Sequence, residues 1–278
     1  MKEAIKSFAK SIGLYNYYIK KKRQKYAGYA VCTMDFRGLR LKFNTKDVYS
    51  KSWFFPRFGY GQIHEPGATN IFIDNINQGA NVFDIGGHLG YFSCVAGQLS
   101  HNGTVCVFEV DANCIDLIKE NVELNHLKNV KIFHSAVSDS SGMVSIPKLE
   151  LPNPGLRIES SKGSMQIKVP STTIDEFISQ KKVVPDFMKI DVEGAEFKVL
   201  KGMENTLKNE SLILLIEIHV SQLSKHYNTD YKDVLKLLKE NGFKLEKVES
   251  HRSNKTGLKE LSHTDELSGN VMILCRKQ

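Results

Sequence analysis

Residues 81–91 read NVFDIGGHLGY, and together with residues 105–111, VCVFEVD, they decide the fold. In the first stretch an apolar run reaches an acid, Asp84, and a glycine-rich turn follows it. In the second stretch another apolar run ends on Glu109. A strand, a glycine turn, a helix and a second strand tipped by an acid form the nucleoside-binding crevice of doubly wound folds. The second acid is placed to accept both hydroxyls of a ribose.

The spelling of the turn discriminates between two classes of nucleoside cofactor. Its glycines are Gly86, Gly87 and Gly90. They do not match G-x-G-x-x-G, which seats a pyrophosphate on a helix N-terminus, and Asp84 just before them would repel a pyrophosphate. A carboxylate at this place suits a cation such as the amino group of a methionine moiety. S-adenosylmethionine carries that amino group, a sulfonium and a ribose, and no phosphate. The pattern D-x-G-x-x-x-G at residues 84–90 resembles the first motif of Rossmann-like methyltransferases, which implies a site for this cofactor.

The composition indicates a soluble globular protein with one large domain and an extension. The chain has 278 residues, of which 41% are hydrophobic and 25% are charged. It contains no apolar run long enough to span a bilayer, and its N-terminus does not resemble a signal peptide. Its five cysteines are an odd number and include no C-x-x-C pair. We therefore expect buried free thiols in a cytoplasmic protein.

The positive charge is concentrated in the N-terminal segment. Residues 1–60 hold 14 Lys and Arg against three acids, a net charge of +11, whereas the whole chain carries +7. A solvated helix face is one explanation, because apolar positions in residues 3–23 have the spacing of an amphipathic helix. The other is attraction to an anionic partner, which would be a membrane surface, a nucleic acid or a phosphorylated substrate. In the membrane case the protein would be peripheral.

Strand and helix patterns alternate after residue 81, which predicts a mainly parallel sheet with helices on both faces. The expected helices are residues 65–78, 90–99, 111–125, 172–177, 195–207 and 231–241. The expected strands are residues 82–85, 104–109, 130–134, 143–146, 166–169, 187–192, 212–218, 243–248 and 271–275. Residues 249–269 read as a loop, so the last two strands are expected to form an antiparallel pair at the sheet edge. Residues 150–164 read as an insert.

A second group of polar residues lies at two later strand ends. Residues 185–196 read PDFMKIDVEGAE, in which Lys189 and Asp191 are two apart and share one face of a strand. The next apolar strand ends in Glu217 and His219, which are also two apart. Buried charges need partners, and ligands of open α/β sheets lie beyond the carboxyl ends of the strands. These groups are therefore expected to open into the same crevice as the first two acids.

Five segments of the chain resemble the FkbM family of S-adenosylmethionine-dependent methyltransferases. In order they are VFDIGGHLGYFS, VFEVDAN, STTIDEF, PDFMKIDVEGAEFKVLKGM and LLIEIH. The block K-I-D-V-E-G-A-E is the most diagnostic, and the resemblance covers roughly residues 62–276. The first motif departs from the common form, because Gly87-His88 stands where the family usually has Ala-Asn. The resemblance implies a Rossmann-like methyltransferase domain at residues 62–278, preceded by a basic, aromatic-rich α+β extension at residues 1–61.

The family resemblance also implies the reaction and the positions that bind the cofactor. The expected activity is O-methylation of a hydroxyl on a sugar, glycan or polyketide-type natural product. Glu109 would hold the ribose, Val110 would lie against the adenine, and Ser135-Ala136 would border it. The full set of implied cofactor positions is Asp84, Gly86, Gly87, His88, Gly90, Tyr91, Phe92, Glu109, Val110, Ser135, Ala136 and Asp191.

Methyl transfer to a hydroxyl requires alignment of the acceptor, removal of its proton and exclusion of water. Asp191 is the first candidate for the base or for an orienting group, and His219 is an alternative base. Lys189 would stabilise a developing oxyanion or form an ion pair with a neighbouring carboxylate. Glu193 and Glu217 would position acceptor hydroxyls. A metal ion on Asp191, Glu217 and His219 is chemically feasible, but no spacing requires one and none is expected.

Three other functions compete with this interpretation. A methyltransferase of nucleic acid, RNA in particular, would fit the basic N-terminal segment, but the chain has no N-P-P-Y or D-P-P-Y motif. A non-catalytic glycan-binding protein would not bind S-adenosylmethionine, and an NAD-dependent dehydrogenase would bind NADH. The expected partner is accordingly a hydroxyl-bearing small molecule or a glycan, and not a nucleic acid.

Overall fold

The computed structural model describes residues 30–278, except residues 45, 48–49, 55–62, 150–164 and 263–264. The chain divides into two compact units at the junction between residues 64 and 65. The predicted helix over residues 3–23 and the predicted insert over residues 150–164 both lie outside the described residues.

The first unit contains a β-hairpin. Its strands are β1 (Val31–Phe36) and β2 (Leu39–Asn44), which pair antiparallel. The two residues between them, Arg37 and Gly38, have positive φ angles of 48° and 80°. Such a pair gives the two-residue turn that matches the twist of a hairpin. A π-helical turn follows at Ser50–Phe54.

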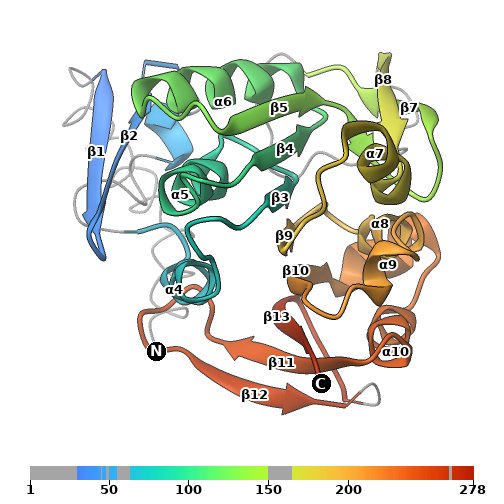
Figure 1. Cartoon of the computed structure of the whole chain (residues 1–278). Coiled ribbons are helices and arrows are strands. Elements are labelled where there is room, and N and C mark those ends of the chain that lie inside the picture. Colours follow the sequence, from blue (N-terminus) through green and yellow to red (C-terminus); the bar gives the residue numbers. More distant parts are fainter. Residues whose placement is uncertain (1–29, 45, 48–49, 55–62, 150–164, 263–264) are drawn as a thin grey trace, which may run out of the picture. The chain divides into compact units, whose positions relative to one another are not determined.

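The second unit is built on an eight-stranded sheet with the order β12-β11-β13-β10-β9-β3-β4-β5 (Figure 1). Five neighbouring strands, β10, β9, β3, β4 and β5, are parallel, whereas β13 is antiparallel to both β10 and β11. The strands are β3 (Val82–Ile85), β4 (Val105–Glu109), β5 (Val130–His134), β9 (Phe187–Ile190), β10 (Ile213–His219), β11 (Phe243–Glu249), β12 (Gly257–Leu261) and β13 (Asn270–Lys277).

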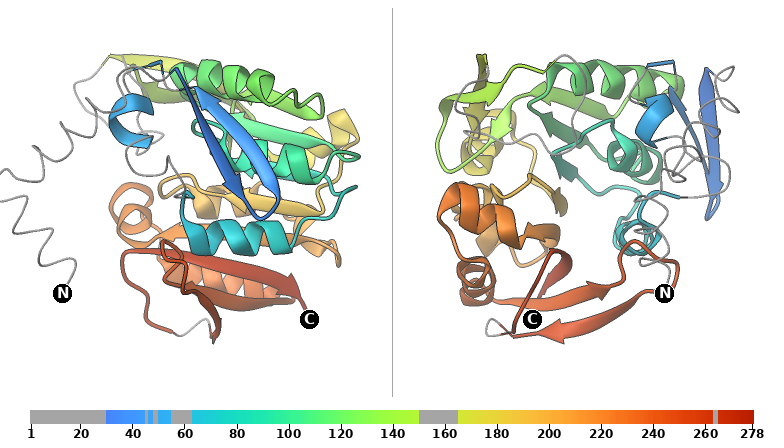
Figure 2. Two further views of the ribbon diagram at one scale, coloured as in Figure 1. Left: turned by 90° about the vertical axis from the view of Figure 1, so that its left-hand side faces the viewer. Right: turned by 180° about the vertical axis from the view of Figure 1, so that it is seen from behind.

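Helices cover both faces of this sheet, as predicted. Figures 1 and 2 show α4, α5 and α6 on one face and α7, α8, α9 and α10 on the other. The helices are α4 (Pro66–Asp74), α5 (Tyr91–Leu99), α6 (Ala112–Leu124), α7 (Ile174–Lys181), α8 (Glu196–Lys201), α9 (Val220–Tyr227) and α10 (Tyr231–Glu240). A smaller sheet has the order β6-β8-β7, with β6 (Ala136–Val137), β8 (Gln166–Thr172) and β7 (Gly142–Pro147).

The strand order fixes where a ligand site can form. The chain continues from β3 to β4 and β5 on one side of the sheet and later places β9 and β10 on the other side of β3. All residues of β3 and β9 are buried, as in parallel strands covered on both faces. The carboxyl ends of β3 and β9 therefore form the topological switch point, where ligands of such sheets bind.

Three secondary-structure predictions were wrong. Helix α9 was not predicted. Its apolar residues Val220, Leu223 and Tyr227 have helical spacing, but its other five positions are polar and Leu223 alone among the eight is buried. Residues 249–269 are not one loop, since β12 lies within them and pairs with β11. The expected helix over residues 195–207 is shorter and is followed by a 3-10 turn at Thr206–Lys208.

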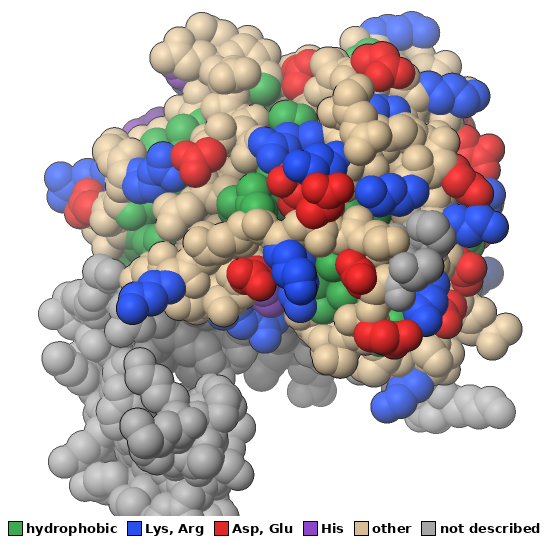
Figure 3. All heavy atoms as spheres, turned by 90° about the horizontal axis from the view of Figure 1, so that it is seen from below, with side chains coloured by type: hydrophobic (Ala, Val, Ile, Leu, Met, Phe, Trp, Pro, Cys, Tyr) green, Lys and Arg blue, Asp and Glu red, His purple; other side chains and the backbone are tan. Residues whose placement is uncertain are grey.

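The antiparallel part of the sheet also differs in one detail. β11 and β13 pair antiparallel as expected, but β13 is internal and β12 is the edge strand. Four of the five residues of β12 are exposed. Basic and acidic side chains are interspersed on the face seen from below (Figure 3). Lys244 of β11 pairs with Glu260 of β12 at 3.7 Å. Charges along an edge strand oppose pairing with another chain.

Two predictions from composition can be compared with the structure. All five cysteines are buried free thiols, as expected. Within the described ranges, no helix combines the length and apolar character needed to cross a bilayer.

Candidate active site

The glycine turn after β3 closes against the strand that carries Asp191. Gly86 has a φ of +84°, and the N–H groups of Gly86 and Gly87 donate to the carbonyl oxygen of Phe108 at 2.9 and 3.1 Å. A Cβ atom on Gly86 would lie 2.0 Å from the carbonyl oxygen of Asp191. Only glycine fits here, because both the backbone conformation and the close approach exclude a side chain. The turn and the end of β9 are therefore held in direct contact.

Glu109, at the end of β4, binds the same turn. Its carboxylate accepts hydrogen bonds from the backbone N–H groups of His88 at 2.7 Å, Val110 at 2.7 Å and Asp111 at 2.9 Å. Burial raises the pKa of Glu109 to about 7, although these three donors oppose the shift. His88, where the chain departs from the family's usual motif, has a positive φ of 52°. Glu109 thus fixes the backbone of the turn at that residue.

Lys189 lies between two aspartates at the switch point. Its Nζ is 3.7 Å from Oδ1 of Asp84 and 3.3 Å from Oδ2 of Asp191. Asp84 also accepts a hydrogen bond of 2.6 Å from the hydroxyl of Ser93, while its Oδ1 accepts none among the described residues. Burial alone would lower the pKa of Lys189, but the charges of Asp191 and Asp84 raise it above its ordinary value. The ion pair expected for Lys189 is therefore a triad with Asp84 and Asp191, in which Lys189 and Asp84 are buried.

The pKa of Asp191 is lowered. Burial opposes ionisation of this carboxyl, but the positive charges of Lys189 and His219 outweigh that effect. The Asp191 side chain is 28% exposed, whereas those of Lys189 and His219 are 3% and 1% exposed. Asp191 is thus the ionised group of this cluster that a ligand can reach.

A hydrogen bond to Glu196 fixes the imidazole of His219. Its Nδ1 lies 2.8 Å from Oε1 of Glu196, a residue with no exposed surface. Its Nε2 faces Oδ1 of Asp191 at 3.8 Å and Oε1 of Glu193 at 3.6 Å. Burial disfavours the imidazolium, but the hydrogen bond to Glu196 and the charge of Asp191 raise the pKa of His219 to about 10. At neutral pH the ring is therefore positively charged.

Glu217 belongs to a second charge network beside the first. Its Oε1 accepts a hydrogen bond of 3.2 Å from Nη2 of Arg252, whose Nε donates to Glu65 at 3.0 Å. His251 Nε2 lies 3.7 Å from the same Glu217 oxygen. Burial, together with the charges of Asp191 and Glu65, raises the pKa of Glu217 to about 8. The strand ends thus hold more negative charge than their cations neutralise.

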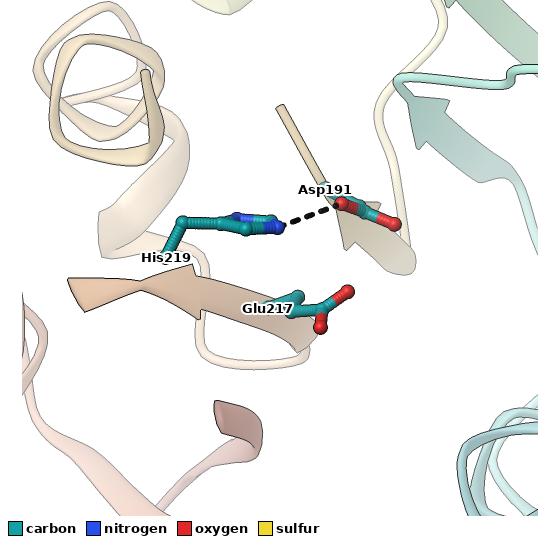
Figure 4. A group of neighbouring side chains, drawn as sticks. All are labelled: Asp191, Glu217 and His219. Atoms are coloured by element: carbon teal, nitrogen blue, oxygen red, sulfur yellow. Dashed lines mark ion pairs between the residues drawn. The ribbon is translucent and has the colours of Figure 1, made fainter. Parts of the chain in front are cut away.

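The structure brings together the five residues that the sequence assigned to the reaction. Lys189, Asp191 and Glu193 follow one another at the end of β9, and Glu217 and His219 lie on the adjacent parallel strand. Figure 4 shows the imidazole of His219 directed at Asp191.

The remaining expected cofactor positions differ in their exposure. Tyr91 and Phe92 are 3% and 5% exposed. Thr69 donates to the hydroxyl of Tyr91 at 3.3 Å, and the Phe92 ring lies 5.0 Å from the Nζ of Lys189. Ala136 is also buried, whereas Val110 and Ser135 are half-buried. Their roles in cofactor binding stay predictions.

Two residues of the cluster were missed at the sequence level. Glu196 lies inside the K-I-D-V-E-G-A-E block, three residues after Glu193. Its place in this block was a signal that it belongs to the site. Arg252 lies in the segment that was expected to be a loop, and no motif marks it. It joins Glu65 and Glu217, which are far apart in the sequence.

The model of the methyltransferase FkbM domain matches residues 84–245. This match contains the glycine turn, the acid at the end of β4 and the cluster at the ends of β9 and β10. The chain belongs to the FkbM methyltransferase family. It is therefore an S-adenosylmethionine-dependent methyltransferase, as the sequence predicts.

Relatives of this FkbM methyltransferase are found in sequence and in structure. Hexuronic acid methyltransferase AglP of Haloferax volcanii is 30% identical over 177 residues, which cover 63% of this chain and 68% of AglP. Methyltransferase FkbM from Methylobacillus flagellatus KT is 13% identical with a TM-score of 0.45, over 72% of this chain and 44% of that one. Precorrin-6y C5,15-methyltransferase from Geobacter metallireducens GS-15 is 12% identical with a TM-score of 0.44, over 75% and 87% of the chains.

The strand ends of this FkbM methyltransferase carry carboxylates suited to a cationic cofactor. S-adenosylmethionine carries a sulfonium and an amino group. Asp84 precedes the glycine turn, and its buried Oδ1 accepts no hydrogen bond among the described residues. The half-buried Gly86 and His88 lie beside the buried carboxylate of Glu109. A cationic nucleoside therefore fits this set of residues better than a pyrophosphate does.

Proposed function

We propose that the chain transfers a methyl group from S-adenosylmethionine to a hydroxyl oxygen of a sugar or glycan. The observation that carries this proposal is the position of Asp191. Its backbone contacts the glycine turn through Gly86, and its side chain faces His219. Asp191 thus lies next to both the glycine turn, which binds the cofactor in this proposal, and His219, which contacts the acceptor. The relative named hexuronic acid methyltransferase supports a sugar as the acceptor.

In this proposal the cofactor is held by the residues around the glycine turn. Glu109 binds the ribose hydroxyls, and the backbone at Gly86, His88 and Gly90 receives the methionine end. Asp84 acts through Lys189, with which it forms an ion pair, or directly on the methionine amino group. Val110 and the pair Ser135-Ala136 border the adenine. The bound cofactor supplies an electrophilic methyl carbon on its sulfonium.

The residues at the ends of β9 and β10 act on the acceptor. Asp191 is ionised and reachable, so it can accept the proton of an acceptor hydroxyl or orient that hydroxyl for in-line attack. His219 is charged at neutral pH, so it acts as a donor rather than as the base. Lys189 holds Asp191 in place and limits its motion. Glu193 and Glu217 position further hydroxyls of the acceptor.

The acidic character of the site favours a hydroxyl over a carboxylate as the attacking group. A carboxylate of the acceptor is already deprotonated at neutral pH and needs no base. It would also be repelled by Asp191 and Glu193. A sugar hydroxyl is a weak acid, and a nearby carboxylate therefore helps its attack.

The test separates cofactor binding from turnover. Full-length protein is incubated with isotopically labelled S-adenosylmethionine and glycans that contain hexuronic acid, and labelled products are detected by mass spectrometry. Asp191→Asn should bind the cofactor as the wild type does and should transfer the methyl group about 10²- to 10⁴-fold more slowly. Asp116→Asn is the matched control, because Asp116 forms an exposed pair with Lys119 at 3.1 Å. Full turnover by Asp191→Asn would remove Asp191 from the reaction.

A further inference from the structure

Three side chains at the ends of β9 and β10 converge closely enough to share one ligand. One ligand atom from each of Asp191, Glu217 and His219 lies within 4.8 Å of the other two. Figure 4 shows the three side chains together, with the imidazole pointing at Asp191. They come from adjacent parallel strands, which are paired through Ile190 and Ile216 just before them. The backbone therefore fixes the separation of the three groups.

The imidazole is presented as a ligand and not as a packed core residue. The hydrogen bond from Nδ1 to Glu196 fixes the ring, and Glu196 has no exposed surface. The His219 side chain is 1% exposed, yet its Nε2 makes no hydrogen bond within 3.5 Å to any described residue. Its neighbours Asp191 and Glu193 lie beyond that distance. A carboxylate behind the ring and an unbonded nitrogen in front are typical of metal-binding histidines. Without a cation the ring is protonated, so a cation that binds at Nε2 displaces the proton from this nitrogen.

Each carboxylate of the group is anchored by one oxygen and leaves the other unbonded. Oδ2 of Asp191 accepts a hydrogen bond from Lys189, and Oε1 of Glu217 accepts one from Arg252. The remaining oxygens, Oδ1 of Asp191 and Oε2 of Glu217, accept no hydrogen bond in the part of the chain that the structure describes. The anchors orient the carboxylates, and the other oxygens remain available for a cation.

We propose that Asp191, Glu217 and His219 bind a divalent first-row cation through two carboxylate oxygens and one imidazole nitrogen. The sequence spacing alone did not require a metal ion on these residues, and the structure adds that their ligand atoms lie close together. A mixed set of nitrogen and oxygen ligands suits Mn²⁺ or Zn²⁺ better than Mg²⁺, which prefers oxygen alone. Three protein ligands leave further positions open.

The open positions give the cation a role that rests on the proposed function. An acceptor hydroxyl that binds there has its pKa lowered by the cation and its oxygen held in a fixed direction. Two neighbouring oxygens of a sugar, such as those of a vicinal diol, can occupy two positions at once. The cation therefore selects acceptors that offer adjacent oxygens.

The test measures metal binding directly and without an acceptor. Full-length protein is freed of metal with a chelator and dialysed, and MnCl₂ or ZnCl₂ is titrated by calorimetry. Free Mn²⁺ is followed by electron paramagnetic resonance. The wild type should bind one ion per chain. Glu217→Gln and Asp191→Asn should each weaken binding at least about tenfold, and Glu196→Gln, which removes the support behind His219, about 10- to 100-fold.

The control is a carboxylate in a similar setting. Glu246 is a mostly buried carboxylate that pairs with an arginine, Arg276, in the same sheet, as Glu217 pairs with Arg252. Glu246→Gln should bind Mn²⁺ as the wild type does. Should a site variant fold poorly, nitrogen hyperfine coupling from bound Mn²⁺ in the wild type reports the imidazole ligand without any substitution.

The outcomes separate this inference from the proposed function. The metal site is overturned if the wild type binds neither ion. It is also overturned if the wild type and all three site variants bind an ion equally well. Methyl transfer to a sugar in the presence of chelator would then still support the proposed function. Metal binding with the predicted losses, but no transfer to any hydroxyl acceptor, supports the site and contradicts the function.

Discussion

The ammonium of Lys189 lies 3.7 Å from the carboxylate of Asp84, and both side chains are almost completely buried, at 3% and 1% exposure. The two residues are paired across the parallel strands β9 and β3. This ion pair connects the strand that starts the cofactor turn with the strand that carries Asp191. Removing one member leaves a buried charge without its partner, which is costly in a low-dielectric interior.

Lys189→Met is expected to lower the free energy of unfolding by about 3–5 kcal/mol, because it leaves Asp84 buried and unpaired. Urea denaturation measures the change. Lys119→Met is the control, because Lys119 pairs with Asp116 on the surface, and its loss should cost at most about 1 kcal/mol. The double variant Asp84→Asn/Lys189→Met should recover part of the loss. If Lys189→Met and Lys119→Met lower the free energy of unfolding equally, the ion pair between Lys189 and Asp84 does not stabilise the contact between β9 and β3.

Gly86→Ala should destabilise the protein and abolish cofactor binding. Its Cβ would lie 2.0 Å from the Asp191 carbonyl, in addition to the strain of a φ of +84°. Gly242 provides a matched control, since its φ is +80° and a Cβ added there would meet no atom within 4 Å. Gly242→Ala should cost only the backbone strain, about 1–2 kcal/mol. Thermal unfolding and calorimetry with S-adenosylmethionine compare the two, and equal effects would mean that the close approach is unimportant.

Glu109→Gln should weaken S-adenosylmethionine binding about 10- to 100-fold. The substitution replaces charged acceptors, which contribute about 1.5–3 kcal/mol per hydrogen bond. It also loosens the backbone of the turn, because Glu109 binds the N–H of His88. Isothermal titration calorimetry measures the affinity. Glu123→Gln, on α6, changes the charge equally at a distance from the crevice and should leave the affinity unaltered.

The stability of the fold should depend on pH through Glu109. Its pKa in the folded protein is about 7, compared with an ordinary value of 4.5. Between these values the folded protein holds a proton that the unfolded chain has lost. This group therefore favours folding most below pH 4.5, and that contribution is lost as the pH rises through 7.

If the ionised carboxylate binds the ribose, cofactor affinity should rise as the pH increases from about 6 to about 8. Glu109→Gln should flatten this dependence. An unchanged slope in the variant would assign the titration to another group.

Much of the fold follows from local patterns in the sequence. The apolar runs before Asp84, Glu109 and Asp191 predict parallel strands, and the glycine spacing predicts the turn. The sheet topology then places the ends of these strands at one edge. Lys189 and Asp191 could be paired in advance because side chains two apart in a strand share a face.

Other features depend on contacts between distant segments. Arg252 contacts Glu65, 187 positions away, and Glu217, 35 positions away. No local pattern encodes such a contact. Helix α9 is short and buries one residue, and β12 is an edge strand with four of its five residues exposed, so the apolar pattern of each covers few positions. The orientation of His219 depends on Glu196, which lies on a different element.

The central claim is that the methyl group reaches a hydroxyl oxygen of a sugar. The most direct test is nuclear magnetic resonance of the product formed from S-adenosylmethionine with a ¹³C-labelled methyl group and a glycan that contains hexuronic acid. The account predicts a methyl ether on a ring hydroxyl, stable to mild alkali. A methyl ester on the carboxylate, which mild alkali removes, or a methyl group on nitrogen or carbon would contradict it.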